Sequence, residues 1–150
     1  MMNQKICVWT LVFLSCAVLA GCTTAISPPP VGIETVRDVA LPITVEKVWY
    51  RTEKIRLLGL AYEKSGIITV SENAVEFMHE NGKIRIPRES IQKVVWGKLS
   101  PDITNDWVIV YYASSGKDEV AAFKGAFALF SGSEKNSKIY SAILHIMKAK

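Results

Sequence analysis

The chain has 150 residues, 49% of them hydrophobic, which is enough to bury a sizeable core in one domain. Its formal net charge is +4 at pH 7, but the basic side chains are interspersed with acidic ones, which excludes the massed basic surface of nucleic-acid-binding proteins. All three cysteines lie within the first 22 residues, so the rest of the chain can form no disulfide and offers no thiol nucleophile.

The first 21 residues are predicted to be an export signal. A short start with one positive charge, Lys5, is followed by the run 6–20, which is apolar apart from Thr10 and Ser15. At about 15 residues, this run is shorter than the roughly 20 that a membrane-spanning helix needs. We therefore expect the signal to be cleaved and the domain to lie outside the cytoplasm.

The apolar run closes on Leu19-Ala20-Gly21-Cys22. This stretch resembles the lipobox of bacterial lipoprotein precursors. The resemblance implies cleavage between Gly21 and Cys22 and acylation of Cys22, for instance with palmitate, which would anchor the protein in a membrane. The alternative is an uncleaved N-terminal anchor with an incidental cysteine at its edge.

The residue after the cysteine bears on the location of the anchor. In two-membrane bacteria, an aspartate there retains lipoproteins in the inner membrane, and this chain has Thr23. By resemblance to that sorting rule, we expect an outer-membrane anchor that faces the periplasm. In a source with one membrane, the same anchor would lie in the cell membrane.

Residues 22–46 are predicted to be a lipidated N-terminus and a linker. Pro28-Pro29-Pro30 favours extended polyproline II, which would hold the domain away from the membrane. The domain itself is predicted to span residues 47–150. Residues 32–62 give mixed signals, with a first strand at 47–53 or, alternatively, a short amphipathic helix.

A group of strands and turns is predicted from residue 66 onward. A β-rich run at 67–70 and an alternating run at 75–79 are separated by turn-forming residues at 71–73. Asn81-Gly82 favours a type I′ hairpin turn, in which both central residues need positive φ. The following strand alternates Ile84 and Ile86 with Lys83 and Arg85 and ends at Pro87.

Three further strands are predicted, at residues 91–96, 107–113 and 119–124. A polar loop at 101–105 and a turn at 115–117 separate them. The strand at 107–113 is apolar throughout, which is typical of a strand covered on both faces or central to its sheet.

Residues 125–132 are apolar but interrupted by glycine, so they allow a strand, a turn over the core or a partly exposed loop. Phe127, Leu129 and Phe130 of this stretch are weak candidates for contacts with an apolar ligand, because they would form an unusual patch if exposed.

The last segment has a helical period. Ser133 can cap a helix, and Ile139, Ile143, Ile146 and Met147 repeat at intervals of three and four residues. The expected fold is therefore mainly β with a C-terminal α-helix.

The order of these patterns resembles that of pleckstrin-homology-like (PH-like) and GRAM-type domains. The residues that carry the resemblance are residues 66–70, Val75-x-Phe77, Asn81-Gly82, Ile84-x-Ile86-Pro87 and Ile91-x-x-Val94. The resemblance implies a partly open barrel of two near-orthogonal antiparallel sheets that the helix caps. It also implies binding rather than catalysis, although no basic cluster matches the phosphoinositide pocket of some members.

The sequence offers little chemistry for an enzyme. His79 and His145 lie in different predicted elements, and neither has neighbours at metal-ligand spacing. Ser114-Ser115-Gly116 is not the nucleophile elbow of a hydrolase. We therefore predict a protein that is not an enzyme and has no cofactor or metal.

Two functions remain open at this point. The first is a lipid-anchored envelope lipoprotein that acts as a non-catalytic interaction or scaffold module for another envelope protein. The alternative is a periplasmic binding protein for a lipid or other apolar ligand, motivated by residues 125–130. A deep apolar pocket would favour the second, and a filled core with an unpaired strand edge would favour the first.

Overall fold

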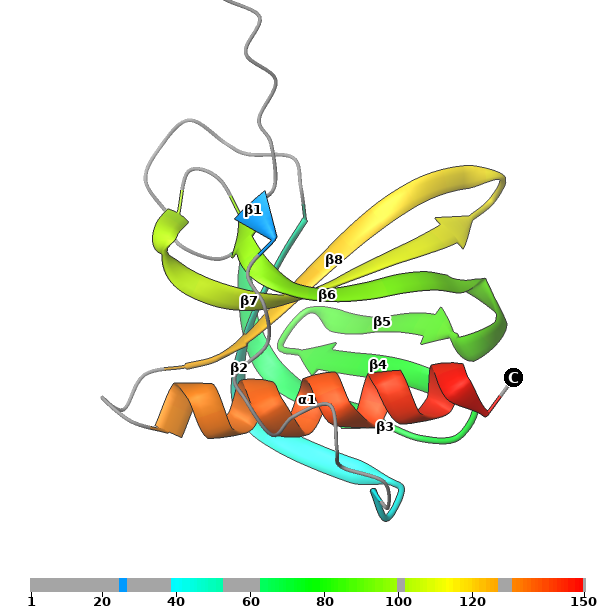
Figure 1. Cartoon of the computed structure of the whole chain (residues 1–150), viewed down its shortest axis with the longest axis horizontal. Coiled ribbons are helices and arrows are strands. Elements are labelled where there is room, and N and C mark those ends of the chain that lie inside the picture. Colours follow the sequence, from blue (N-terminus) through cyan, green and yellow to red (C-terminus); the bar gives the residue numbers. More distant parts are fainter. Residues whose placement is uncertain (1–24, 27–38, 53–62, 100–101, 127–130, 150) are drawn as a thin grey trace, which may run out of the picture.

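The computed structural model describes residues 25–26, 39–52, 63–99, 102–126 and 131–149. The elements, in chain order, are β1 (Ala25–Ile26), β2 (Ile43–Thr52), β3 (Lys64–Val70), β4 (Ala74–His79), β5 (Gly82–Pro87), a 3-10 turn (Arg88–Ser90), β6 (Ile91–Leu99), β7 (Asp102–Ser114), β8 (Lys117–Gly125) and α1 (Ser131–Lys148). The predicted mainly-β fold with a C-terminal helix is confirmed (Figure 1).

The strands form one antiparallel sheet in the order β1-β6-β7-β8-β2-β3-β4-β5. It is continuous because β2 pairs with β3 along one side and with β8 along the other. The sheet does not close, since β5 and β6 are not hydrogen-bonded neighbours. The expected barrel of two separate sheets is thus not confirmed.

A bulge in β2 explains why the start of the first long strand was predicted too late. The register with β3 shifts between Val45 and Val48, and Lys47 has a φ of 54°. Both valines are buried, whereas strict alternation would place two residues three apart on opposite faces. The bulge breaks the alternation, so the strand begins at Ile43 and not at residue 47. The alternative of a short helix is wrong for residues 43–52, and residues 53–62 lie outside the described residues.

The β4–β5 turn differs from the predicted type I′ turn at Asn81-Gly82. His79 pairs with Gly82, so Glu80 and Asn81 form the loop, and only Gly82 has a positive φ, of 144°. A type I′ turn occurs instead between β7 and β8, where Ser115 and Gly116 have φ values of 50° and 75°. Both turns lie within one residue of their predicted positions, but the turn types depend on the strand register.

The polar loop predicted at 101–105 is also wrong. β7 begins at Asp102, which pairs with Leu99 of β6. Polar residues signal exposure rather than conformation. The register with β6 shifts from Lys98↔Asp106 to Leu99↔Asp102, so residues 103–105 lie in an irregular part of the ladder. The helix begins two residues before the predicted cap, Ser133, although Glu134 lies in its first turn as expected.

The core lies between the inner face of the sheet and α1, which contacts β8, β6, β2, β7 and β3 (Figure 1). Side chains from both ends of the sheet and from the helix meet there without exposed surface: Val48, Ile68, Val70, Phe77, Ile86, Val108, Val110, Phe123, Ile139 and Ile143. The helix therefore covers an interior that close-packed side chains fill.

A second apolar cluster lies on the outer face of β6, β7 and β8. It comprises Val95, Leu99, Trp107, Ile109 and Ala122, with Trp49, Tyr111 and Val120 partly buried against it. Both faces of β7 are thus buried, as its continuous apolar sequence predicts.

Candidate functional site

One edge of the sheet is formed by β5. Within the described part of the chain, β5 pairs with β4 and with no other strand. Because His79 and Gly82 close a two-residue loop, alternation along the ladder points the backbone N–H and C=O groups of Lys83 and Arg85 away from β4. An unpaired edge of this kind is a template for another strand.

The outer face beside this edge carries a small charged cluster. Glu76 of β4 accepts hydrogen bonds from Lys83, at 2.9 Å, and from Arg85. The bond from Lys83, followed by that from Arg85, lowers the pKa of the Glu76 carboxyl, so Glu76 remains charged across the neutral range. Two cations against one carboxylate leave an excess positive charge along β5.

Apolar side chains lie next to these charges. Ile67 of β3 and Met78 of β4 are paired across the strands, and their side chains are 39% and 60% exposed. Met78 also pairs with Lys83. The outer surface of β3, β4 and β5 is therefore a mixed apolar and basic strip, unlike the buried outer face of β6, β7 and β8.

The inner face ends in a cluster of titratable and aromatic side chains. Tyr50 stacks on Phe77 with ring centroids 5.3 Å apart, and the Lys64 Nζ lies 5.9 Å from the Tyr50 ring. Lys64 Nζ is also 3.4 Å from Nε2 of His79, which stacks on Phe77. His79 is thus a half-buried packing residue.

Two tyrosines in this region are kept protonated. Burial raises the pKa of Tyr50 to about 12, with the charges of Glu63 and Glu119 adding to the effect. Burial also raises the pKa of Tyr112, whose hydroxyl donates a 2.9 Å hydrogen bond to Glu119. Neither phenol is activated as a nucleophile or base near neutral pH.

Buried cations on the outer face pack against aromatic rings. Lys124 and Arg51 are 7% and 5% exposed. Lys124 Nζ lies 4.9 Å from the ring of Trp49, and the Arg51 guanidinium lies 5.6 Å from that of Trp107. Lys124 also donates to the Oδ1 of Asn105. These contacts give the second cluster a polar component that rigidifies β2, β7 and β8.

Asn136 is a residue that the sequence reasoning missed. Its Oδ1 accepts from the backbone N–H of Gly125 at 2.8 Å, and its Nδ2 donates to the backbone oxygen of Asp106 at 2.9 Å. One buried side chain therefore joins α1 to β7 and β8. A lone asparagine on a helix gives no sequence signal for such contacts, because both partners are distant in the chain.

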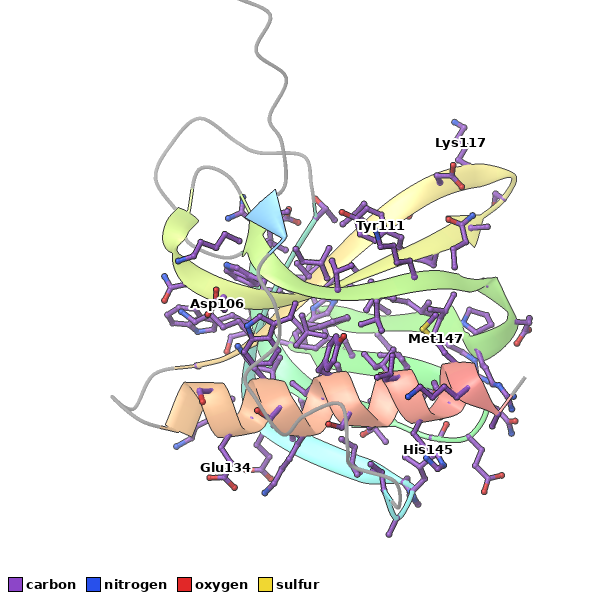
Figure 2. The ribbon with its side chains drawn as sticks, viewed as in Figure 1. Asp106, Tyr111, Lys117, Glu134, His145 and Met147 are labelled. Atoms are coloured by element: carbon purple, nitrogen blue, oxygen red, sulfur yellow. The ribbon has the colours of Figure 1, made fainter. Side chains whose placement is uncertain are left out.

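Figure 2 shows how several side chains lie relative to the sheet and the helix. Glu134 and His145 point away from the sheet along α1, Met147 points toward it, and Lys117 projects from the tip of the β7–β8 hairpin. His79 lies at the end of β4 and His145 in α1, and no group of three His, Cys, Asp or Glu suited to a metal ion occurs among the residues described. No helix in the described ranges is long and apolar enough to cross a membrane.

The other predicted site residues are not among those that the structure describes. Gly21 and Cys22, at the predicted cleavage and lipidation site, lie outside the described residues, as do Phe127, Leu129 and Phe130. Cleavage, lipidation and apolar-ligand contacts at these positions therefore stay predictions.

Comparison with known proteins informs the fold alone. No protein-family model and no curated protein matches the chain. A chain in the solved structure described as "The 8S snRNP Assembly Intermediate" is similar, with a TM-score of 0.51 and 10% sequence identity. The alignment covers 85% of this chain and 92% of that one.

Proposed function

We propose that the protein is a lipid-anchored envelope lipoprotein that works as a non-catalytic interaction module and captures a partner along β5. The observation that carries this proposal is the free edge of β5, which presents backbone groups of Lys83 and Arg85. An extended segment of an envelope protein can add to such an edge as a further strand. The filled inner core supports the same proposal, because it leaves little room for a ligand there.

The charges on β5 indicate the chemistry of the partner. Lysines and arginines on an edge strand discourage unspecific pairing, and Pro87 limits its length. A segment with acidic side chains on its outer face would meet Lys83 and Arg85 favourably, whereas a basic one would be repelled. The partner is therefore an acidic extended segment.

The PH-like assignment is part of this proposal. It is supported by the strand order, in which β2 joins β3, β4 and β5 to β8, β7 and β6, and by the single C-terminal helix. The sequence patterns quoted above, which resemble PH-like and GRAM-type domains in their order along the chain, support the same assignment. An apolar-ligand function, the alternative, would depend on residues 127–130.

The capture proposal can be tested by photo-crosslinking in the native envelope. A photoreactive residue in place of Lys83 should give a defined adduct, and one in place of Lys138, on the exposed side of α1, should not. Arg85→Pro removes an outward N–H, while Arg85→Gln removes only the charge and keeps that donor. We expect Arg85→Pro to abolish the adduct and Arg85→Gln to weaken it.

Two results would contradict capture along β5. One is an adduct of the same yield from both photoreactive positions, and the other is an adduct that Arg85→Pro leaves unchanged. Lys117→Gln, at the tip of the other hairpin, is the matched charge control and should have no effect.

The anchor is tested separately. Cys22→Ser should give an unprocessed precursor that incorporates no labelled fatty acid, because the thiol is the acceptor of the lipid. Normal maturation and labelling of this variant would show that Cys22 is not the lipidation site.

A further inference from the structure

The segment that follows the predicted lipidation site is a strand of the sheet. Ala25 pairs with Lys98 and Ile26 with Gly97, so β1 occupies the edge of β6 that β7 leaves free. Cys22 precedes Ala25 by three residues. Because an extended chain covers about 3.3–3.6 Å per residue, the Cα of Cys22 lies within about 11 Å of the Cα of Ala25.

Because β1 precedes the proline run in the chain, the prolines do not separate Cys22 from the sheet. Residues 28–30 come after β1 and before β2 in the chain. The proline run therefore belongs to the connection from β1 to β2 and not to the segment that joins Cys22 to β1. The sequence predicts a lipidated N-terminus and a linker over residues 22–46, with the proline run holding the domain away from the membrane. With β1 paired, only residues 23 and 24 separate Cys22 from the sheet.

We propose that β1 docks the domain directly on a lipid bilayer in a fixed orientation, with the Lys98 end of β6 toward the headgroups. The inference rests on the proposed lipidation of Cys22. In Figure 1, β1 lies at the upper left and the end of α1 that carries Lys148 lies far from it, at the right. Lys98 suits anionic headgroups, and Lys148 is expected to remain in solvent.

The test uses the mature lipoprotein in liposomes that contain nitroxide-labelled headgroups. All native cysteines lie in the first 22 residues, so a single introduced cysteine can carry a fluorophore. Lys98→Cys and Lys148→Cys place that label near to β1 and far from it. We expect the label at 98 to be quenched and the label at 148 to be largely unquenched.

Variants of β1 identify the cause of any difference. Ala25→Pro with Ile26→Pro removes both backbone donors, whereas Ala25→Ser with Ile26→Thr keeps them. We expect the proline pair to abolish the difference between the two labels and to speed hydrogen exchange at Gly97 and Lys98. The Ser/Thr pair should preserve both properties.

The outcomes separate this inference from the proposed function. Mass spectrometry of the N-terminal peptide reports acylation of Cys22, and an unmodified Cys22 would overturn both proposals for the anchor. If Cys22 is acylated but the labels are quenched equally, or the proline pair leaves their difference intact, only docking through β1 is wrong.

Discussion

Gly66 shows how a single position sets the distance between two strands. It pairs with His79, and a Cβ built there would lie 2.0 Å from the backbone oxygen of Met78 and 3.1 Å from the Phe77 ring. Because the nearest atom belongs to the backbone, a side chain cannot be accommodated by a rotamer change. The sheet therefore requires glycine at this point for close approach.

We predict that Gly66→Ala destabilises the domain by about 1–3 kcal/mol, the range expected for overpacking. Urea denaturation of the domain would measure the loss. Ser65→Ala, at the exposed neighbouring position, is the control and should change stability by no more than about 0.5 kcal/mol. Equal urea midpoints for both variants would show that β3 and β4 can move apart far enough to accommodate a methyl group at position 66.

Because of Tyr50, the stability of the folded protein is expected to change with pH in the alkaline range. Its pKa is raised from 10.0 to about 12 in the folded protein, so above pH 10 the unfolded chain loses its proton first. The unfolded state then binds fewer protons, and stability falls as the pH rises from about 10 to 12. Below pH 10 the phenol is protonated in both states, so it does not make the free energy of unfolding depend on pH.

We expect Tyr50→Phe to flatten this part of the stability profile, since the variant has no proton to lose at position 50. Thermal melts from pH 9 to pH 12 would compare it with the native chain. The loss of melting temperature over that range should be smaller for Tyr50→Phe. Parallel profiles would show that the Tyr50 phenol titrates alike in both states.

At the scale of elements, α1 is held by polar as well as apolar contacts. Tyr140 packs edge-on against Trp96 of β6, with ring centroids 6.0 Å apart. Asn136 forms hydrogen bonds with the backbone N–H of Gly125 and the backbone C=O of Asp106. The apolar contacts fix which face of α1 is buried. The two hydrogen bonds fix its position along the sheet, because they require particular partners.

Asn136→Leu is predicted to cost about 2–6 kcal/mol, since it removes the partner of the Gly125 N–H and of the Asp106 C=O, at roughly 1–3 kcal/mol each. Chemical denaturation would measure this cost. Lys138→Leu, with the native side chain 63% exposed on the same helix, controls for the change to leucine and should be nearly neutral. A neutral Asn136→Leu would mean that water replaces both bonds.

For the whole molecule, α1 closes the interior of an open sheet. Ile139, Ile143 and Ile146 are at most 1% exposed and belong to the same cluster as core residues of β2–β8. Removing the helix would uncover the inner faces of the strands that it contacts, which are β2, β3, β6, β7 and β8. The helix is therefore part of the core rather than an appendage.

Truncation after Gly132 should abolish the cooperative thermal melt and cause aggregation. Ile143→Ala is the milder variant and should cost about 2–5 kcal/mol through the cavity that it leaves. Lys148→Ala, at an exposed position, should leave the melt unchanged. A soluble truncated chain that still melts cooperatively would contradict this role of α1.

The sequence by itself determined the type and order of most elements. Alternation with period two predicts β4 and β5, and the three- and four-residue spacing of Ile139, Ile143 and Ile146 predicts α1. Those signals are local, because a strand or helix exposes its own period. The resemblance of residues 19–22 to a lipobox is equally local, because it is carried by four consecutive residues.

Only the tertiary structure decided the features that depend on distant residues. The pairing of β1 with β6, the bulge at Lys47 and the contacts of Asn136 each join segments far apart in the chain. Among the described strands, β5 forms an edge because of the strand order and not because of its own sequence. Such features carry no local period, since their stability comes from partners that only folding brings together.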